Sequence, residues 1–415
     1  AGSDRIDVGA GDDVIHVSGV SGHDIVDGGI GRDTLKIDWS NRGLIQHSFE
    51  VEDSSGNKYL QIVDHSSRFD DIQILYSQAV GHAYGNYSQS SLSTNVSYRD
   101  IEAVSIVGSS RNDFFLHQKN YISIFNGNGG ADTLYADLSE WKLDISLTND
   151  HSIQTVTNGA VESLTISNVD RLLLQTGDGS DTIVQKVVST NDDIRLGNGN
   201  DTFALESQSG SDVVDGGSGS DLLSVNWSQE GSTFMQIRRA NGSWISVGYS
   251  MDEIKRNLID ATQYGYSSSA YYYDNSGVYV NRSASNLKYK NFENFSITGG
   301  VYNDTLVYQQ GGVSSFNGNG GVDTLYADLS TWTSNVILTN DGSLQTLTNS
   351  ETESLMVSNI ERLLIQTGSG ADTISNTVFE TNDEIVTGAG NDSVNAGAGS
   401  DRIDVGAGDD VIHVS

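Results

Sequence analysis

Aspartates recur nine residues apart along this chain, each at the end of a short glycine-rich turn. Towards the C-terminal end, segments 387–395, 396–404 and 405–413 all read x-G-x-G-x-D-x-apolar-x. The glycines accept backbone conformations that other residues avoid, and the acid supplies hard oxygen atoms. The apolar residue two places after the acid can point into a core, as alternate residues of a strand do.

The nonapeptide occurs in arrays and in single copies. The arrays cover residues 8–36, 176–224 and 367–413. The single copies are 108–116, 127–135, 299–307 and 318–326. Two blocks inside the arrays, 187–195 and 378–386, lack the glycines and keep only Asn-Asp-x-Ile. A nine-residue period of this composition is typical of a calcium-binding parallel β-roll.

The composition agrees with a stack of regular coils. The 415 residues include 46 glycines, no proline and no cysteine, and the formal net charge is −33. Proline lacks the N–H that an inner strand must donate. The negative charge argues against nucleic acid or anionic lipid as a partner. The absence of cysteine excludes disulfides and thiolate metal sites, and no apolar stretch is long enough to predict a membrane span.

Repeats also exist at two longer scales. Residues 1–18 recur letter for letter as 398–415. Because the chain also begins inside a repeat, without a signal peptide, we expect it to be a fragment, one unit of a longer tandem array. Within the unit, 125–139 returns as 316–330 with few changes.

This organisation predicts seven segments. The calcium β-roll arrays are 1–36, 176–224 and 367–415, the inserts are 37–107 and 225–298, and the isolated turn pairs with strand-rich bridges are 108–175 and 299–366. The sequence leaves open whether the inserts form wider coils or separate lobes, and we favour wider coils.

Each insert contains one helix candidate. In 250–260, Ser250 and Glu253 have capping-box spacing, and Met251, Ile254 and Leu258 share one face. A weaker candidate, 67–76, aligns Phe69, Ile72 and Tyr76 in the same way.

Two nonapeptides make one coil, so acids 18 residues apart should stack. Asp383 then lies over Asp401, and Asp392 over Asp410. Where two residues are inserted the spacing becomes 20, in the pairs Asp4/Asp24, Asp13/Asp33, Asp181/Asp201, Asp192/Asp212, Asp201/Asp221 and Asp372/Asp392. Neighbouring coils are about 4.8 Å apart, so stacked carboxylates repel unless a divalent cation lies between them.

These phased motifs resemble the repeats-in-toxin (RTX) family of type I secreted bacterial proteins. The resemblance implies an all-β, right-handed parallel β-roll or β-solenoid, here an elongated rod with strand-rich inserts. It implies several Ca²⁺ ions between successive turns, held by aspartate carboxylates and loop carbonyls. It also implies a chain that is disordered in low calcium and folds after export.

The resemblance maps the metal ligands onto two sets of residues. The aspartates are Asp4, Asp13, Asp24, Asp33, Asp181, Asp192, Asp201, Asp212, Asp221, Asp372, Asp383, Asp392, Asp401 and Asp410. The accompanying glycines are Gly22, Gly31, Gly179, Gly199, Gly210, Gly219, Gly370, Gly390, Gly399 and Gly408. The turns at Asp192 and Asp383 lack glycines, which predicts another shape there. The single acids Asp113, Asp132, Asp304 and Asp323 have no partner 18 residues on, so their role as ligands stays open.

No catalytic residues are predicted. The eight histidines have no metal-ligand spacing, and neither a G-x-S-x-G elbow nor a phosphate loop is present. The tyrosine-rich stretch from Tyr264 to Tyr279 could stack on sugar rings, but cross-strand packing is the simpler interpretation.

The pattern favours a calcium-binding structural repeat of a very large secreted or cell-surface bacterial protein, such as an adhesin. Its partners would be the neighbouring repeats of the same chain, and the fragment would be a monomer. Two alternatives are inserts that bind a surface glycan or receptor, and the export segment of a secreted toxin or hydrolase.

Overall fold

The computed structural model describes most of the chain. The described residues are 2–18, 22–41, 43–52, 58–64, 66–78, 85–89, 94–159, 162–188, 190–206, 210–259, 261–268, 271–273, 279–281, 285–309, 311–350, 353–377 and 379–413. The chain divides into two compact units, Ala1–Gly197 and Asn198–Ser415, which are described separately.

Unit 1 contains eighteen of the strands and one helix. Its elements are β1 (Arg5–Asp7), β2 (Val14–Val17), β3 (Gly22–Asp27), β4 (Thr34–Asp38), β5 (Ile45–Glu52), β6 (Lys58–Val63), α1 (Phe69–Gln78), β7 (Gly85–Gln89), β8 (Thr94–Arg99), β9 (Ala103–Val107), β10 (Phe114–His117), β11 (Ile122–Asn126), β12 (Thr133–Asp137), β13 (Ser146–Asn149), β14 (Gln154–Thr157), β15 (Ser163–Ser167), β16 (Arg171–Gln175), β17 (Thr182–Gln185) and β18 (Asp193–Arg195).

Unit 2 follows the same plan. Its elements are β19 (Thr202–Leu205), β20 (Gly210–Asp215), β21 (Leu222–Asn226), β22 (Thr233–Arg239), β23 (Trp244–Ser246), α2 (Met251–Ile259), β24 (Ala261–Ser268), β25 (Tyr271–Tyr273), β26 (Tyr279–Asn281), β27 (Ser285–Lys290), β28 (Asn294–Thr298), β29 (Thr305–Tyr308), β30 (Val313–Asn317), β31 (Thr324–Asp328), β32 (Ile337–Thr339), β33 (Gln345–Ser350), β34 (Glu353–Ser358), β35 (Arg362–Gln366), β36 (Thr373–Ser375), β37 (Glu384–Val386), β38 (Ser393–Asn395), β39 (Arg402–Asp404) and β40 (Val411–His413).

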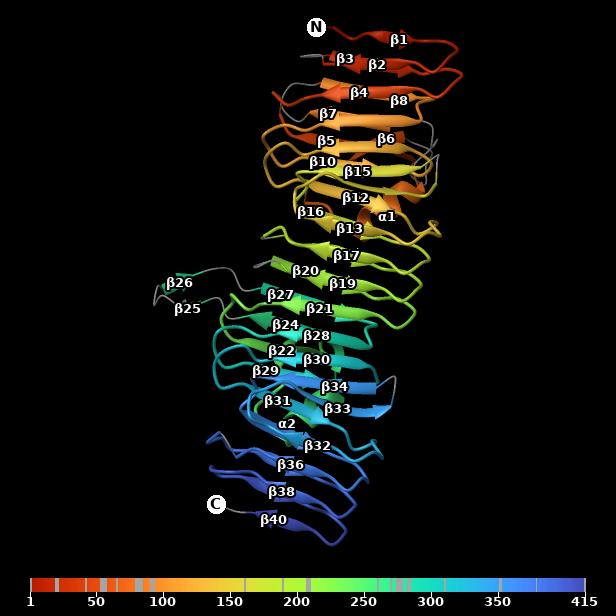
Figure 1. The fold of residues 1–415 in the computed structure, drawn as a ribbon. Coiled ribbons are helices and arrows are strands. Elements are labelled where there is room, and N and C mark those ends of the chain that lie inside the picture. The colour runs from red at the N-terminus through yellow and green to blue at the C-terminus, as the bar shows by residue number, and fades with distance from the viewer. Residues whose placement is uncertain are drawn as a thin grey trace. The chain divides into compact units, whose positions relative to one another are not determined.

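The strands of each unit stack in mostly parallel sheets, as Figure 1 shows. Along β15, buried Leu164 and Ile166 alternate with half-buried polar residues, because successive side chains of a strand point to opposite faces. The predicted all-β parallel roll is confirmed. Neither helix in the described part of the chain is long and apolar enough to cross a membrane.

The strand register follows the coil lengths expected from the sequence. Val14 pairs with Thr34 and Ile374 with Val394, which are coils of 20 residues. Ile385 pairs with Ile403, a coil of 18 residues. The predicted change of coil length within the C-terminal array is therefore confirmed.

The inserts add strands to the sheets of the roll. In unit 1 the order β3-β8-β7-β5 continues a parallel pair with antiparallel strands, and in unit 2 the order β20-β27-β24-β22-β29 does the same. These strands fit the wider coils that we favoured. The hairpin of β25 and β26 differs, because within the described residues it pairs only with itself.

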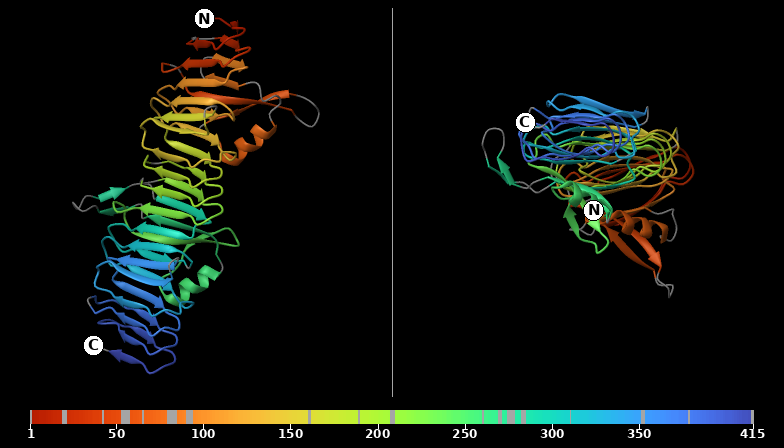
Figure 2. Two further views of the ribbon diagram at one scale, coloured as in Figure 1. Left: turned by 45° about the vertical axis from the view of Figure 1, so that its right-hand side comes forward. Right: turned by 90° about the horizontal axis from the view of Figure 1, so that it is seen from below.

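One helix covers each unit's sheet where an insert leaves the roll (Figure 2). Both helix predictions are confirmed: Ser250 Oγ accepts the Glu253 N–H at 3.3 Å, and Met251 and Ile254 are buried, as are Phe69 and Ile72 in α1. The side chain of Tyr76 lies outside the described residues.

An arginine of the following bridge anchors the start of each helix. Arg171 donates to the carbonyls of Ser67 and Asn191 at 3.1 and 2.6 Å. Arg362 donates to those of Tyr249 and Asn382 at 2.9 and 2.7 Å. These arginines occupy equivalent places in the internal duplication, so the two helices are fixed by the same device.

Candidate metal centres

The predicted aspartates form ladders that run from coil to coil within each unit. The backbone N–H of one aspartate donates to Oδ1 of the aspartate one coil later. The bonds are Asp4 to Asp24 (3.0 Å), Asp13 to Asp33 (2.9 Å), Asp201 to Asp221 (2.8 Å), Asp372 to Asp392 (2.8 Å), Asp383 to Asp401 (3.0 Å) and Asp392 to Asp410 (2.9 Å). The structure thus brings these predicted partners together.

The remaining predicted pairs each have one member in either unit. Asp181/Asp201 and Asp192/Asp212 therefore stay predictions. Within their own units, Asp181 and Asp212 are both buried, and Asp181 Oδ1 accepts the Ile145 N–H at 2.8 Å.

Burial of the acids follows their place along the chain. Asp4 is exposed, and Asp13, Asp401 and Asp410 are half-buried. The other predicted aspartates are buried: Asp24, Asp33, Asp181, Asp192, Asp201, Asp212, Asp221, Asp372, Asp383 and Asp392. Buried carboxylates need either hydrogen-bond donors or a cation.

The single-copy acids are not isolated, contrary to the sequence interpretation. The N–H of Asp113 donates to Oδ1 of Asp132, and that of Asp304 to Oδ1 of Asp323, each at 2.7 Å and across 19 residues. Their coils are one residue longer than the 18 expected, and this is why the spacing in the sequence did not reveal the pairs.

Each of four ladders ends on an acid that the sequence analysis missed. The bonds are Asp33 N–H to Glu102 (2.7 Å), Asp132 to Asp170 (2.7 Å), Asp221 to Glu293 (2.9 Å) and Asp323 to Glu361 (2.7 Å). A common signal precedes them: an Asp or Asn with positive φ, an apolar residue, then the acid. The first residues are Asp100, Asn168, Asn291 and Asn359, with φ between 49° and 56°.

A second ladder runs beside the first and was also missed. The residue before each aspartate is often Asn or Asp, and its Oδ1 accepts a backbone N–H from the adjoining coil. Asn382 accepts from Ser400 at 2.8 Å, and Asn391 from Asp409 at 3.0 Å. The Asn-Asp dipeptide that survives in the glycine-poor blocks was the available signal.

The predicted glycines bring the turns of neighbouring coils into close contact. All of them except Gly370 have φ between +116° and +156°. A Cβ on Gly219 would lie 1.6 Å from the carbonyl oxygen of Gly199, and one on Gly408 equally close to that of Gly390. The glycines therefore allow one turn's carbonyl to abut the next turn.

At several turns the other carboxylate oxygen has no protein donor. The buried Oδ2 atoms without a hydrogen-bond partner include those of Asp13, Asp33, Asp132, Asp221, Asp323 and Asp392. A Cβ on Gly127 would lie 2.2 Å from Asp132 Oδ2 and 2.0 Å from the Asn168 carbonyl oxygen. A Cβ on Gly216 would meet Asp221 Oδ2 and the Asn291 carbonyl oxygen in the same way. Oxygens that converge without a donor fit a hard cation such as Ca²⁺.

Burial makes some of these carboxyls reluctant to ionise without a cation. It raises the pKa of Asp132 to about 9, with smaller contributions from the charges of Asp113 and Asp170. Burial likewise raises the pKa of Asp323 to about 8 and shifts that of Asp221 upwards. A bound cation would favour the charged form of each.

A small cavity lies next to Asp132 in unit 1. Its volume is about 110 Å³, and its lining includes Asp132, Asp170 and His151, with His151 Nε2 3.2 Å from Asp170 Oδ1. Space of this size beside two acids suits an ion with its hydration water.

The glycine-poor turns are different, because protein groups supply their donors. Asp383 Oδ1 accepts from the Leu363 N–H and Oδ2 from Asn376 Nδ2, at 2.9 and 2.8 Å. Asp192 Oδ2 accepts from Gln185 Nε2 and Thr190 Oγ1, at 2.7 and 2.8 Å. The changed turn shape expected at Asp192 and Asp383 thus places neutral donors where the other turns present a bare oxygen.

Comparisons with known proteins identify the repeated segments. The family described as the RTX calcium-binding nonapeptide repeat (4 copies) matches residues 1–35, 189–223 and 379–412. No curated protein sequence matches the chain. The matched segments contain the ladders described above at Asp4–Asp33, Asp201–Asp221 and Asp383–Asp410.

Proposed function

Since this chain carries calcium-binding nonapeptide repeats of the RTX family, we propose that it is a structural repeat of a secreted protein whose folding requires Ca²⁺. Buried Oδ2 atoms without protein donors carry the proposal. Leaving a buried carboxylate uncompensated costs more than its hydrogen bonds return. Ion binding therefore becomes part of the folding free energy.

The proposed ions are bound by acids and carbonyls of successive coils. Asp33, Asp221 and Asp392 each use Oδ1 on the preceding coil's N–H and keep Oδ2 for the metal. Calcium accepts such mixed oxygen ligands at flexible angles. Asp192 and Asp383 hold their coils through protein donors instead, so we assign no ion to their Oδ2 atoms.

We place this repeat in a very large bacterial surface protein of the adhesin, matrix or surface-layer type. The identity of residues 1–18 with 398–415 supports tandem copies, whose arrays would join into longer rolls. Each coil contacts only its neighbours, so such repeats act as stiff, calcium-dependent spacers. No catalytic role is proposed.

A calcium titration followed by circular dichroism tests the proposal. The chelated chain is expected to be largely disordered and to gain β-structure as calcium rises towards the millimolar range. Magnesium at the same concentration should not replace calcium, because it demands a smaller octahedral site and dehydrates reluctantly. An unchanged spectrum in excess chelator would show that the coils fold without ions.

The export segment of a secreted toxin or hydrolase is the second candidate. It would use the same calcium-coupled folding, so the titration does not separate the two. The sequence of the full-length protein does: several copies of this unit favour the surface protein, whereas one copy beside an enzyme domain favours the export segment.

A further inference from the structure

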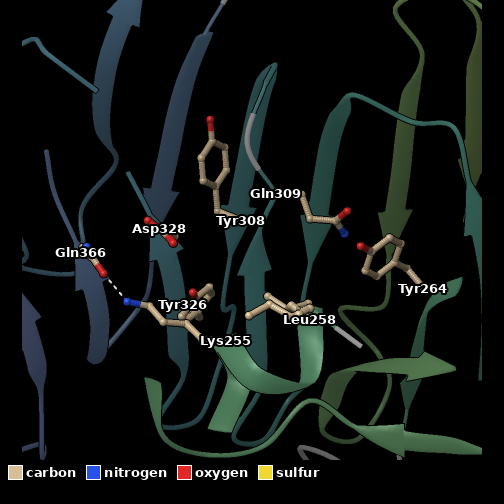
Figure 3. A pocket seen from close by; sticks show the side chains of 9 residues that line it. Lys255, Leu258, Tyr264, Tyr308, Gln309, Tyr326, Asp328 and Gln366 are labelled. Atoms are coloured by element: carbon tan, nitrogen blue, oxygen red, sulfur yellow. Dashed lines mark hydrogen bonds between the residues drawn. The ribbon is translucent and has the colours of Figure 1, made fainter. Parts of the chain in front are cut away.

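Helix α2 and the sheet beneath it enclose the cavity that the function above leaves unused. Its volume is about 550 Å³, within the usual range for small-ligand sites. Figure 3 shows side chains of α2 and of the sheet facing this space. The lining residues are Lys255, Leu258, Ile259, Tyr264, Tyr308, Gln309, Tyr326, Asp328 and Gln366, all in unit 2.

Three tyrosines from separate strands line the cavity. Tyr264 belongs to β24, Tyr308 to β29 and Tyr326 to β31. Tyr308 and Tyr326 are buried at its floor, and Tyr264 is half-buried. The rings are braced from behind, since Tyr264 stacks on Tyr289 at 6.2 Å and Tyr308 meets Trp332 edge-on at 6.4 Å. Rigid aromatic faces suit ligands with flat apolar surfaces.

Polar side chains stand between the rings. Gln309, Asp328, Gln366 and Lys255 are all half-buried along the cavity. Two of them are already held in place, because Lys255 Nζ donates to Gln366 Oε1. Amides offer both donors and acceptors, and a carboxylate accepts from more than one hydroxyl. A ligand with many hydroxyl groups can therefore be bound on several sides.

The cavity's charges offset one another. Lys255 is its one cation and Asp328 its one anion among the lining residues, whereas the whole chain carries −33. A strongly negative protein repels anionic ligands. Pyranose sugars combine apolar C–H faces with neutral hydroxyl edges. We propose that this cavity binds a neutral pyranose saccharide.

The internal duplication provides a tolerated substitution for a test. The place of Tyr308 is held in unit 1 by His117, which meets Trp141 edge-on at 6.1 Å just as Tyr308 meets Trp332. The other polar and aromatic positions match, with Gln118, Tyr135, Asp137 and Gln175 standing for Gln309, Tyr326, Asp328 and Gln366. Tyr308→His thus alters the cavity wall while keeping a side chain that this fold already accepts.

The test uses the whole 415-residue chain in saturating calcium. A printed array of neutral and sialylated glycans examines surface glycans, and calorimetry with maltotriose and cellotriose examines soluble saccharides. We expect binding of at least one neutral probe. Tyr264→Ala, Tyr308→His and Asp328→Asn should each weaken it by about tenfold or more. Tyr249→Ala, an exposed tyrosine outside the cavity, should change it by less than about twofold.

Circular dichroism of each variant in calcium separates loss of the cavity from loss of the fold. The proposal is overturned if no neutral probe binds the folded chain at about 10 mM. It is also overturned if sialylated glycans bind in preference, or if all three cavity variants bind like the parent. Because folding is read independently, failure here leaves the calcium-dependent role intact, and failure to fold with calcium is recognised as such.

Discussion

At the residue scale, the two oxygens of a ladder aspartate have different roles. Oδ1 closes a hydrogen bond to the preceding coil, as from Asp201 to Asp221. Oδ2 is either left without a donor, as in Asp221, or accepts from side chains, as in Asp383 from Asn376. The same motif letter therefore supports two kinds of contact between coils.

Substituting both kinds of aspartate by asparagine separates them. Asp221→Asn replaces the donor-free oxygen by an amide N–H₂, which cannot ligate a cation, so bound calcium should fall by about one ion per chain. Asp383→Asn sets an amide donor against Asn376 and should cost about 1–3 kcal/mol of folding stability with the ion count unchanged. Equilibrium dialysis with elemental analysis counts the ions, and urea denaturation in calcium gives the stability.

The reverse result would refute the division. Loss of an ion from Asp383→Asn, or an unchanged count in Asp221→Asn, would mean that donor-free oxygens do not mark the metal sites.

At the scale of elements, the inserted strands bring a titratable group into the sheet. His47 of β5 is buried, and burial lowers its pKa from 6.5 to about 3. A lowered pKa means that the neutral ring stabilises the fold above about pH 6.5 and that this contribution is lost as the pH falls towards 3. The equivalent strand β22 holds buried Met235 at the same place in the duplication.

His47→Met should therefore make unit 1 less sensitive to acid. At about pH 4.5 the substitution is expected to recover up to about 3 kcal/mol relative to the parent, with little change at neutral pH. Urea denaturation in saturating calcium across this range measures the effect. The carboxylates titrate in both proteins and cancel in the comparison. An equal loss of stability in parent and variant would show that His47 does not control the acid response.

At the scale of the whole molecule, the net charge opposes folding until cations bind. With −33 charges, the chelated chain repels itself, and salt screens this repulsion over about 10 Å at 0.1 M. The ladders concentrate acids at neighbouring coils, so divalent ions act where repulsion is strongest.

Small-angle X-ray scattering can test this balance. Without calcium, the radius of gyration should approach that of an unfolded chain, roughly 75 Å, and should shrink as sodium chloride is added. With calcium it should be smaller and nearly independent of sodium chloride. A chelated chain whose size ignores salt would argue against charge repulsion as the opposing force.

The sequence by itself determined the roll and most of its ladders. The nine-residue period set the coil lengths of 18 and 20, the apolar residue two places after each acid set the core, and helix spacing placed α1 and α2. These features are local or strictly periodic, so spacing in the chain translates directly into spacing in the coil. Asp392 over Asp410 follows from counting alone.

Tertiary structure alone decided which acids share a ladder across the inserts and which oxygens keep a donor. Asp33 meets Glu102, and Asp221 meets Glu293, after excursions of irregular length that no period can count. The same holds for the saccharide cavity, whose tyrosines come from β24, β29 and β31. Contacts between residues far apart in sequence depend on how the intervening chain is packed, and that packing is fixed only when the coils stack.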